Sequence, residues 1–175
     1  MSAVVVDTNV LLLANGMATQ MSDDCRLKCI ERLGRVRDGE AVVVDGQFLI
    51  LGEYQNKLSP NRRPPGPGDA FVKYVLQNMA NATRVSPVDL TPADSAKTEF
   101  AEFPQEDAEL RQAFDPSDRK FVAASNAHPE KPPILEAADS KWLGWEARLL
   151  SHGINVEFIC RQELETIRQR KSASS

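Results

Sequence analysis

Cysteine and histidine are scarce in this sequence, which has three cysteines and two histidines among 175 residues. Cys25, Cys29 and Cys160 cannot all pair with one another, and they form no CxxC motif. This composition excludes a disulfide-rich scaffold and favours the reducing cytoplasm over secretion. Cys25 and Cys29 have no further cysteine or histidine close by in the sequence as a metal ligand, so we expect them to be small core residues.

Long apolar runs and several well-known catalytic motifs are also missing. The first apolar run is interrupted by Asp7, no basic leader precedes it, and no stretch approaches the roughly 20 residues that span a membrane. The sequence contains no GxxxxGK[ST], GxGxxG, GxSxG or HExxH motif. We therefore expect a protein without a membrane partner, and neither a nucleotide-binding, a serine-hydrolase nor a zinc-protease site.

The remaining composition is that of one globular domain, with 42% apolar and 26% charged residues. Such a chain is long enough to bury a substantial core without disulfides or metals. The net charge of −4 argues only weakly against an anionic partner such as nucleic acid.

Short β-branched runs alternate with helical patterns along the chain. The AVVV runs at 3–6 and 41–44 are typical of buried parallel strands, and Ser22 and Gly39 mark the two ends of a helix between them. Further strands are predicted within 82–88, 132–139 and 154–160, and helices at 47–58, 69–81, 116–127 and 141–153, with two acidic helical pieces within 92–113. This alternation predicts an α/β fold with a mainly parallel central sheet and helices on both faces.

The domain organisation follows from the same reading. We expect one domain over residues 1–160, with a flexible loop at 59–68 that holds four prolines and two glycines. Residues 161–175 are predicted to form a C-terminal helix followed by a disordered tail.

Four acidic residues fall where an open parallel sheet places its ligands. Asp7 and Asp139 follow strands, Asp118 lies in the first turn of a helix, and Glu53 borders the apolar face of another helix. Four neighbouring carboxylates would repel one another strongly unless cations neutralise them. Mg²⁺ or Mn²⁺ are the natural occupants of such a site, because hard divalent cations prefer oxygen ligands.

Each acid also has a purely structural interpretation. Asp7 can cap the helix that follows it, Asp118 can belong to a capping box, and Asp139 can be a turn residue. Glu53 can form a surface ion pair with Lys57, four residues later on the same helix.

Four motifs, in order, resemble those of the PIN-domain nucleases. They are VVVDTNVLL (4–12), ILGEYQNKL (50–58), DPSDRKFVAAS (115–125) and ILEAADSKWL (134–143). The resemblance covers about residues 3–160 and implies a PIN-like three-layer sandwich. It further implies metal-dependent cleavage of RNA phosphodiesters, with Asp7, Glu53, Asp118 and Asp139 as the catalytic, metal-binding acids. Divalent ions can activate a water and stabilise both the attacking and the leaving oxygen without a histidine base.

The resemblance also assigns supporting residues. It makes Thr8 and Asn9 supports of the first acid, although Thr8 can equally be an ordinary helix-start residue. Asp115 is expected to assist the metal through water or to cap the helix that follows it. The family often has Ser or Thr two residues before the fourth acid, where this chain has Ala137. Glu136 and Ser140 are the nearby polar residues that can compensate, and the second metal position depends on that compensation.

The charge balance is compatible with RNA as a partner. Without the four site acids, 25 − 4 = 21 acidic residues stand against 21 lysines and arginines. The candidate contacts to the RNA backbone are Arg62, Arg63, Arg119, Lys120 and Lys141.

Two other functions stay open. A phosphatase-like use of Asp7 as nucleophile usually needs a second acid two residues later, where this chain has Asn9. The same fold with an incomplete acid set can instead serve as an RNA- or protein-binding module. If the chain is similar to the toxin ribonucleases of the family, which it exceeds in length, an antitoxin protein and a homodimer are further expected partners.

Overall fold

A single five-stranded sheet forms the centre of the molecule in the computed structural model, which describes residues 2–175. The strands are β1 (Ala3–Val6), β2 (Ala41–Asp45), β3 (Val85–Val88), β4 (Ile134–Glu136) and β5 (Val156–Phe158). Their order is β3-β2-β1-β4-β5, and every neighbouring pair is parallel. The predicted parallel central sheet is therefore confirmed.

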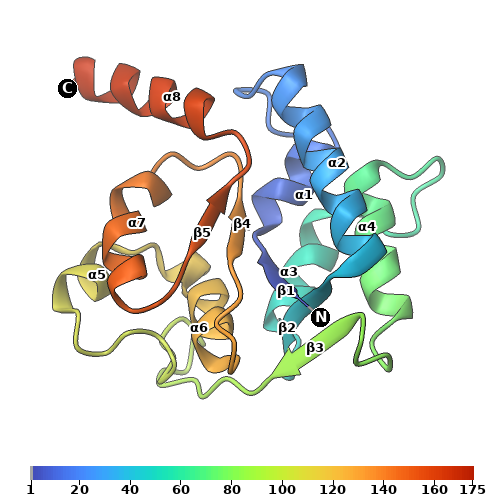
Figure 1. The fold of residues 1–175 in the computed structure, drawn as a ribbon, viewed down its shortest axis with the longest axis horizontal. Helices are drawn as coiled ribbons and strands as arrows, with labels where there is room; N and C mark the ends of the chain where they lie inside the picture. Colours follow the sequence, from blue (N-terminus) through green and yellow to red (C-terminus); the bar gives the residue numbers. More distant parts are fainter. Residues whose placement is uncertain (1) are drawn as a thin grey trace.

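Helices cover both faces of this sheet. They are α1 (Thr8–Ala14), α2 (Asp23–Gly39), α3 (Leu49–Lys57), α4 (Pro67–Gln77), α5 (Ala108–Ala113), α6 (Arg119–Ala127), α7 (Trp142–Ser151) and α8 (Arg161–Ala173), with a 3₁₀ turn η1 (Pro116–Asp118) before α6. In Figure 1, α2 and α4 lie on one side of the sheet, and α6 and α7 lie on the other. The three-layer α/β sandwich predicted from the sequence is the observed architecture.

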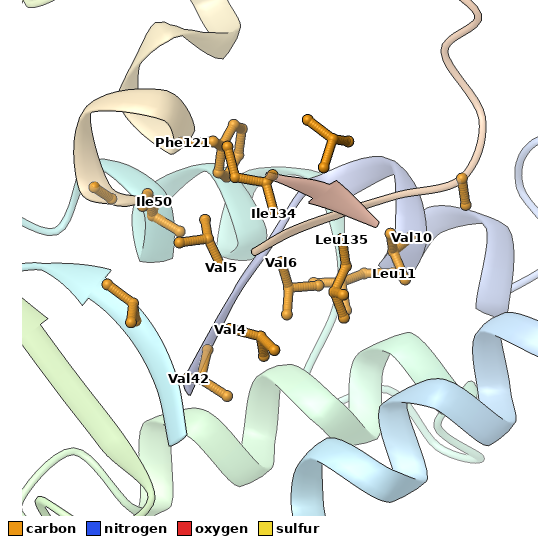
Figure 2. Close-up of a cluster of buried hydrophobic side chains, with 14 of the residues drawn as sticks. Val4, Val5, Val6, Val10, Leu11, Val42, Ile50, Phe121, Ile134 and Leu135 are labelled. Atoms are coloured by element: carbon orange, nitrogen blue, oxygen red, sulfur yellow. The ribbon is translucent and has the colours of Figure 1, made fainter. Parts of the chain in front are cut away.

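The apolar strands explain this layering. All four residues of β1 are buried, so both faces of this central strand must be covered by helices. Figure 2 shows Val5 pointing toward Ile50 and Phe121, and Val4 and Val42 pointing to the opposite side. Burying one valine side chain contributes on the order of 1.5 kcal/mol, so the paired β-branched runs fix the centre of the fold.

The acidic stretch within 92–113 differs from its prediction. It contains one helix, α5, and residues 92–100 instead form a turn closed by a bridge between Pro92 and Phe100. The Asp94 carboxylate accepts the backbone N–H groups of Thr98 and Glu99, each at 2.8 Å. A side chain that accepts hydrogen bonds from backbone N–H groups in this way competes with helix formation. Only one of the two predicted helical pieces is therefore present.

The C-terminal tail also differs from its prediction. Helix α8 continues to Ala173, so most of the expected disordered tail is helical. Arg170 and Lys171 lie in its last turn, where positive charge stabilises the negative end of the helix dipole. Among residues 2–175, no helix combines the length and the apolarity that crossing a bilayer requires.

Two of the three cysteines are joined. A disulfide links Cys25 of α2 to Cys160, which directly precedes α8, across 135 positions of sequence. Cys29 keeps a buried thiol, and Cys25 and Cys29 lie in the core as expected. Cys160 is buried as well, and its disulfide with Cys25 departs from the expectation, drawn from the cysteine content, of a reducing environment. The odd cysteine count left this pairing unpredicted.

Candidate functional site

The predicted acids gather at the carboxyl ends of the central strands. Asp7 directly follows β1, and Asp139 lies three residues beyond β4, the strand paired with β1. Asp118 ends the 3₁₀ turn before α6, and Glu53 lies in α3. Parallel strands and the helix starts that follow them therefore bring distant sequence segments to one edge of the sheet.

Three half-buried carboxylates form the tightest group. Asp115, Asp118 and Asp139 each offer a carboxylate oxygen, and these oxygens all lie within 4.8 Å of one another. Burial, followed by the negative charge of Asp139, raises the pKa of Asp118 to about 6, although the nearby Lys120 acts in the opposite direction. The carboxylates repel one another in the absence of a cation.

Asp7 serves as a helix cap and also keeps an unused oxygen. Its Oδ1 accepts the backbone N–H of Asn9 at 2.7 Å, which caps α1 as the structural interpretation expected. Its Oδ2 is buried and has no hydrogen-bond partner within residues 2–175. Burial raises the pKa of Asp7 well above its usual value, and the charges of Glu136 and Asp118 raise it further.

Glu136 is a fully buried acid that the site prediction did not include among the ligands. Its Oε1 accepts the backbone N–H groups of Ala137, Ala138 and Asp139 at 2.8, 2.8 and 2.9 Å. Its Oε2, like the free oxygen of Asp7, finds no partner in the described chain. Burial raises the pKa of Glu136 to about 7, against the effect of the three backbone hydrogen bonds. An acid inside the apolar run ILEAA is the sequence signal that points to it.

Glu53 is surrounded by positive charge. Its Oε1 accepts the hydroxyl hydrogen of Thr8 at 2.7 Å, and its Oε2 lies 2.5 Å from Lys120 Nζ. Lys57 forms the expected ion pair at 3.6 Å. Burial alone would raise the pKa of Glu53, but Lys120, Thr8 and Lys57 outweigh it and lower the pKa. Glu53 is therefore a charge-balanced carboxylate beside the acidic group.

The expected supporting residues take different places. Thr8 holds Glu53, and Asn9 supports Asp7 through its backbone N–H. Asp115 makes no side-chain cap hydrogen bond; it pairs with Lys141 at 2.8 Å and lies directly among the clustered acids. Ser140 is buried and accepts a hydrogen bond from Lys171 Nζ of α8 at 3.3 Å.

Two of the expected RNA contacts need correction. Arg119 is buried; its guanidinium pairs with Glu99 and donates to the carbonyl oxygen of Phe114. Lys120 is buried in its ion pair with Glu53 and donates to the carbonyl oxygen of Ser117. Both cations are therefore held by partners within the protein and are not free surface charges.

The other three basic candidates remain at the surface. Arg62 is half-exposed and pairs with Asp69 at 3.4 Å, and Arg63 is exposed in the same proline-rich loop. Lys141 is 59% exposed in its side chain and lies beside the clustered acids through Asp115.

The donor set fits a hard divalent cation. It consists of carboxylate oxygens, and two of these, Asp7 Oδ2 and Glu136 Oε2, are buried without partners within residues 2–175. Buried acceptors are normally satisfied, and unpaired carboxylate oxygens beside an acidic cluster are the kind of donor that a hard divalent cation takes. A site of this kind can bind the oxygens of a phosphate through its metal.

The comparisons add no assignment to this geometry: no family model, curated protein or solved structure matches the chain.

Proposed function

We propose that the protein is a Mg²⁺- or Mn²⁺-dependent endoribonuclease that hydrolyses RNA phosphodiester bonds. The observation that carries the proposal is the acidic group at the carboxyl ends of β1 and β4, with its two unpartnered buried oxygens. The resemblance of its four motifs to those of PIN-domain nucleases supports the same activity.

Asp118 and Asp139, joined by Asp115, are the residues that would hold the metal. Asp7 would contribute its free Oδ2 from the end of β1. When bound, a divalent ion neutralises the acids, orients the phosphate and lowers the pKa of a water to generate the nucleophile.

The remaining polar residues keep this group in place. Glu136 holds the turn that carries Asp139 through three backbone hydrogen bonds. Thr8 and Lys120 fix the Glu53 carboxylate at the border of the site. Lys141 lies next to Asp115 and is exposed, so it can bind a phosphate oxygen of an approaching strand.

Cleavage of a labelled RNA pool by the purified protein tests the proposal. We expect cutting with Mn²⁺ or Mg²⁺ that stops with EDTA and with Asp118→Asn or Asp7→Asn. Glu31→Gln, which removes an exposed acid of α2, is the matched control and should cut like the unaltered protein. RNA that stays intact with every divalent metal, or cutting that survives both site variants, contradicts the proposal.

One observation favours a second candidate, a binding module without catalysis. Lys120 and Thr8 already occupy both oxygens of Glu53, so the set of acids free to bind metal is smaller than the resemblance implies. Metal-independent binding of RNA or of a protein, without cutting, is the outcome that this alternative predicts.

The proposed substrate also suggests a cellular location and partner proteins. An RNA-cutting enzyme is placed in the cytoplasm, and the resemblance to toxin ribonucleases adds an antitoxin protein and a second copy of the chain as proposed partners. Copurification from cells and the mass of the purified particle test these partners directly.

A further inference from the structure

A hollow of about 500 Å³ is lined in part by Glu53 and by Pro116 and Ser117 of η1, which lie between two of the clustered acids in sequence. The lining also includes residues of α3, the residue before α3, and residues 95–98. The start of α6 contributes Lys120, which ties the hollow to the proposed metal site through its ion pair with Glu53. We call this hollow the α3 pocket.

An exposed aromatic ring forms part of the pocket lining. Phe48 is 60% exposed, the one aromatic ring among the exposed large apolar side chains of residues 2–175, and it directly precedes α3. Its backbone is left-handed, with φ 61° and ψ 28°, a conformation that non-glycine residues rarely adopt. Such backbone outliers persist where the surrounding structure holds them, and they concentrate at ligand sites.

A second pocket-lining residue, in the segment 95–98, also has a left-handed backbone. Lys97 also has a positive φ, 54°, and it lies at the exposed tip of the turn that replaced the predicted helix. Asp94 fixes this turn by accepting the backbone N–H groups of Thr98 and Glu99. The turn therefore brings a lysine to the same pocket that the aromatic ring lines.

The pocket is positively charged in a protein whose net charge is −4. Three of its lining residues are lysines, Lys57, Lys97 and Lys120, and its one acidic lining residue is Glu53. Both Lys120 and Lys57 pair with Glu53, and three lysines against one glutamate leave a net lining charge of 3 − 1 = +2 to attract an anion.

We propose that the α3 pocket binds one unpaired nucleotide of the RNA next to the bond that is cut. The base stacks on the ring of Phe48, and Lys57 and Lys97 bind the adjoining phosphate. Aromatic rings stack on unpaired bases of any sequence, and lysines beside them neutralise the backbone. This assignment rests on the proposed ribonuclease function, because it places the phosphodiester next to the bound nucleotide at the clustered acids Asp115, Asp118 and Asp139.

Binding of a fluorescein-labelled oligoadenylate, followed by anisotropy with Ca²⁺ in place of Mg²⁺ and checked on a gel for intact RNA, tests the stacking. We expect Phe48→Ala to weaken binding by roughly fivefold to 150-fold, the range measured for loss of one base–aromatic stack. Leu27→Ala is the matched control, because Leu27 is 58% exposed on α2. Adenosine monophosphate serves as a competitor: displacement by it at equal concentration would assign the pocket to free nucleotides instead.

Gly52 allows the pocket to be filled without removing any charge. It lines the pocket within α3, and a Cβ built there meets no atom within 4 Å. Gly52→Trp should therefore fold and block the nucleotide, whereas Gly52→Ala should bind like the unaltered protein. Gly34→Trp, at a helical glycine of α2 with equally open surroundings, controls for the added bulk.

The salt dependence of binding tests the lysine. Removing one phosphate contact from a single strand lowers the slope of log affinity against log salt by about 0.7. We expect this change in Lys97→Ala and no change in Lys73→Ala, which removes an exposed lysine of α4.

The outcomes separate this proposal from the ribonuclease itself. If Phe48→Ala, Gly52→Trp and Lys97→Ala all bind like the unaltered protein while RNA is still cut, the pocket assignment is overturned and the enzyme stands. If the same variants lose binding while no metal supports cutting, the pocket stands and the ribonuclease fails.

Discussion

The metal-free acidic group should reduce the stability of the folded protein at neutral and alkaline pH, and Asp118→Asn should recover part of that stability. The pKa of Asp118 rises from 3.8 to about 6 on folding, mainly through burial and the charge of Asp139. One pKa unit corresponds to about 1.4 kcal/mol, so the limiting effect is about 3 kcal/mol. Because Asp118 is half-buried, solvent screens part of this, and we expect a gain on the order of 1 to 2 kcal/mol.

The sign of the pH dependence follows from the direction of the shift. Between about pH 4 and about pH 6, the folded protein holds a proton on Asp118 that the unfolded chain has released. The free energy of unfolding therefore falls as the pH rises through this window, and Glu136 extends the fall to about pH 7. Asp118→Asn should flatten the lower part of the curve and leave the part that comes from Glu136.

Urea unfolding in EDTA over this pH range measures the effect, with Glu31→Gln as the control for removal of an exposed acid. Adding Mn²⁺ should stabilise the unaltered protein by about 2.7 kcal/mol at a hundred times its dissociation constant, and should stabilise Asp118→Asn much less. The reasoning is refuted if Asp118→Asn is the less stable protein at about pH 8, or if the unaltered protein shows no loss of stability between about pH 4 and pH 7.

Three further predictions concern the residues around the site. Cys160→Ala should lower the free energy of unfolding by about 2 to 5 kcal/mol under oxidising conditions, because the disulfide closes a loop of 135 residues; Cys29→Ala keeps the disulfide and should lose stability when reductant is added, Cys160→Ala should not respond, and equal reductant sensitivity in both variants would contradict this. Arg119→Ala should lower the free energy of unfolding in urea by about 2 to 4 kcal/mol, because its guanidinium is bound inside the protein. The salt slope of oligonucleotide binding should stay unchanged, and a smaller slope would show that Arg119 contacts RNA. Lys120→Met should raise the pKa of Glu53 in a carboxyl NMR titration, because this lysine is the main charge that offsets burial; an unchanged pKa would show that Thr8 suffices.

Regular elements with strong local signals could be predicted from the sequence. The two AVVV runs became β1 and β2, and the helix between them begins after Ser22 and ends at Gly39 as predicted. These features depend on burial periodicity and on capping, which neighbouring residues determine. The position of the acids followed from the same signals, because the strand ends of a parallel sheet lie together.

Features set by one specific side-chain contact could not be predicted. The turn at 92–100 depends on Asp94 binding backbone groups that an acidic helical pattern would have used. The burial of Arg119 depends on Glu99, twenty positions away, although its neighbours in sequence suggested a surface cation beside Asp118. The Cys25–Cys160 pair likewise joins segments that carry no local sign of their proximity.

Glu136 holds the turn that carries Asp139 and adds a buried negative charge near Asp7. Ala137 offers no hydroxyl at the position where the resembling nucleases often have Ser or Thr, and its side chain is fully buried. The preceding glutamate accepts three successive backbone N–H groups and fixes the turn that carries Asp139. Its second oxygen has no partner in the described chain, and its charge raises the pKa of Asp7 across the strand pair β1–β4. Glu136 thus shapes the turn and also adds a negative charge to the site. Each further carboxylate in a dry site increases the electrostatic repulsion, which a bound metal or a proton relieves, so Glu136 increases the effect of a cation on the cluster.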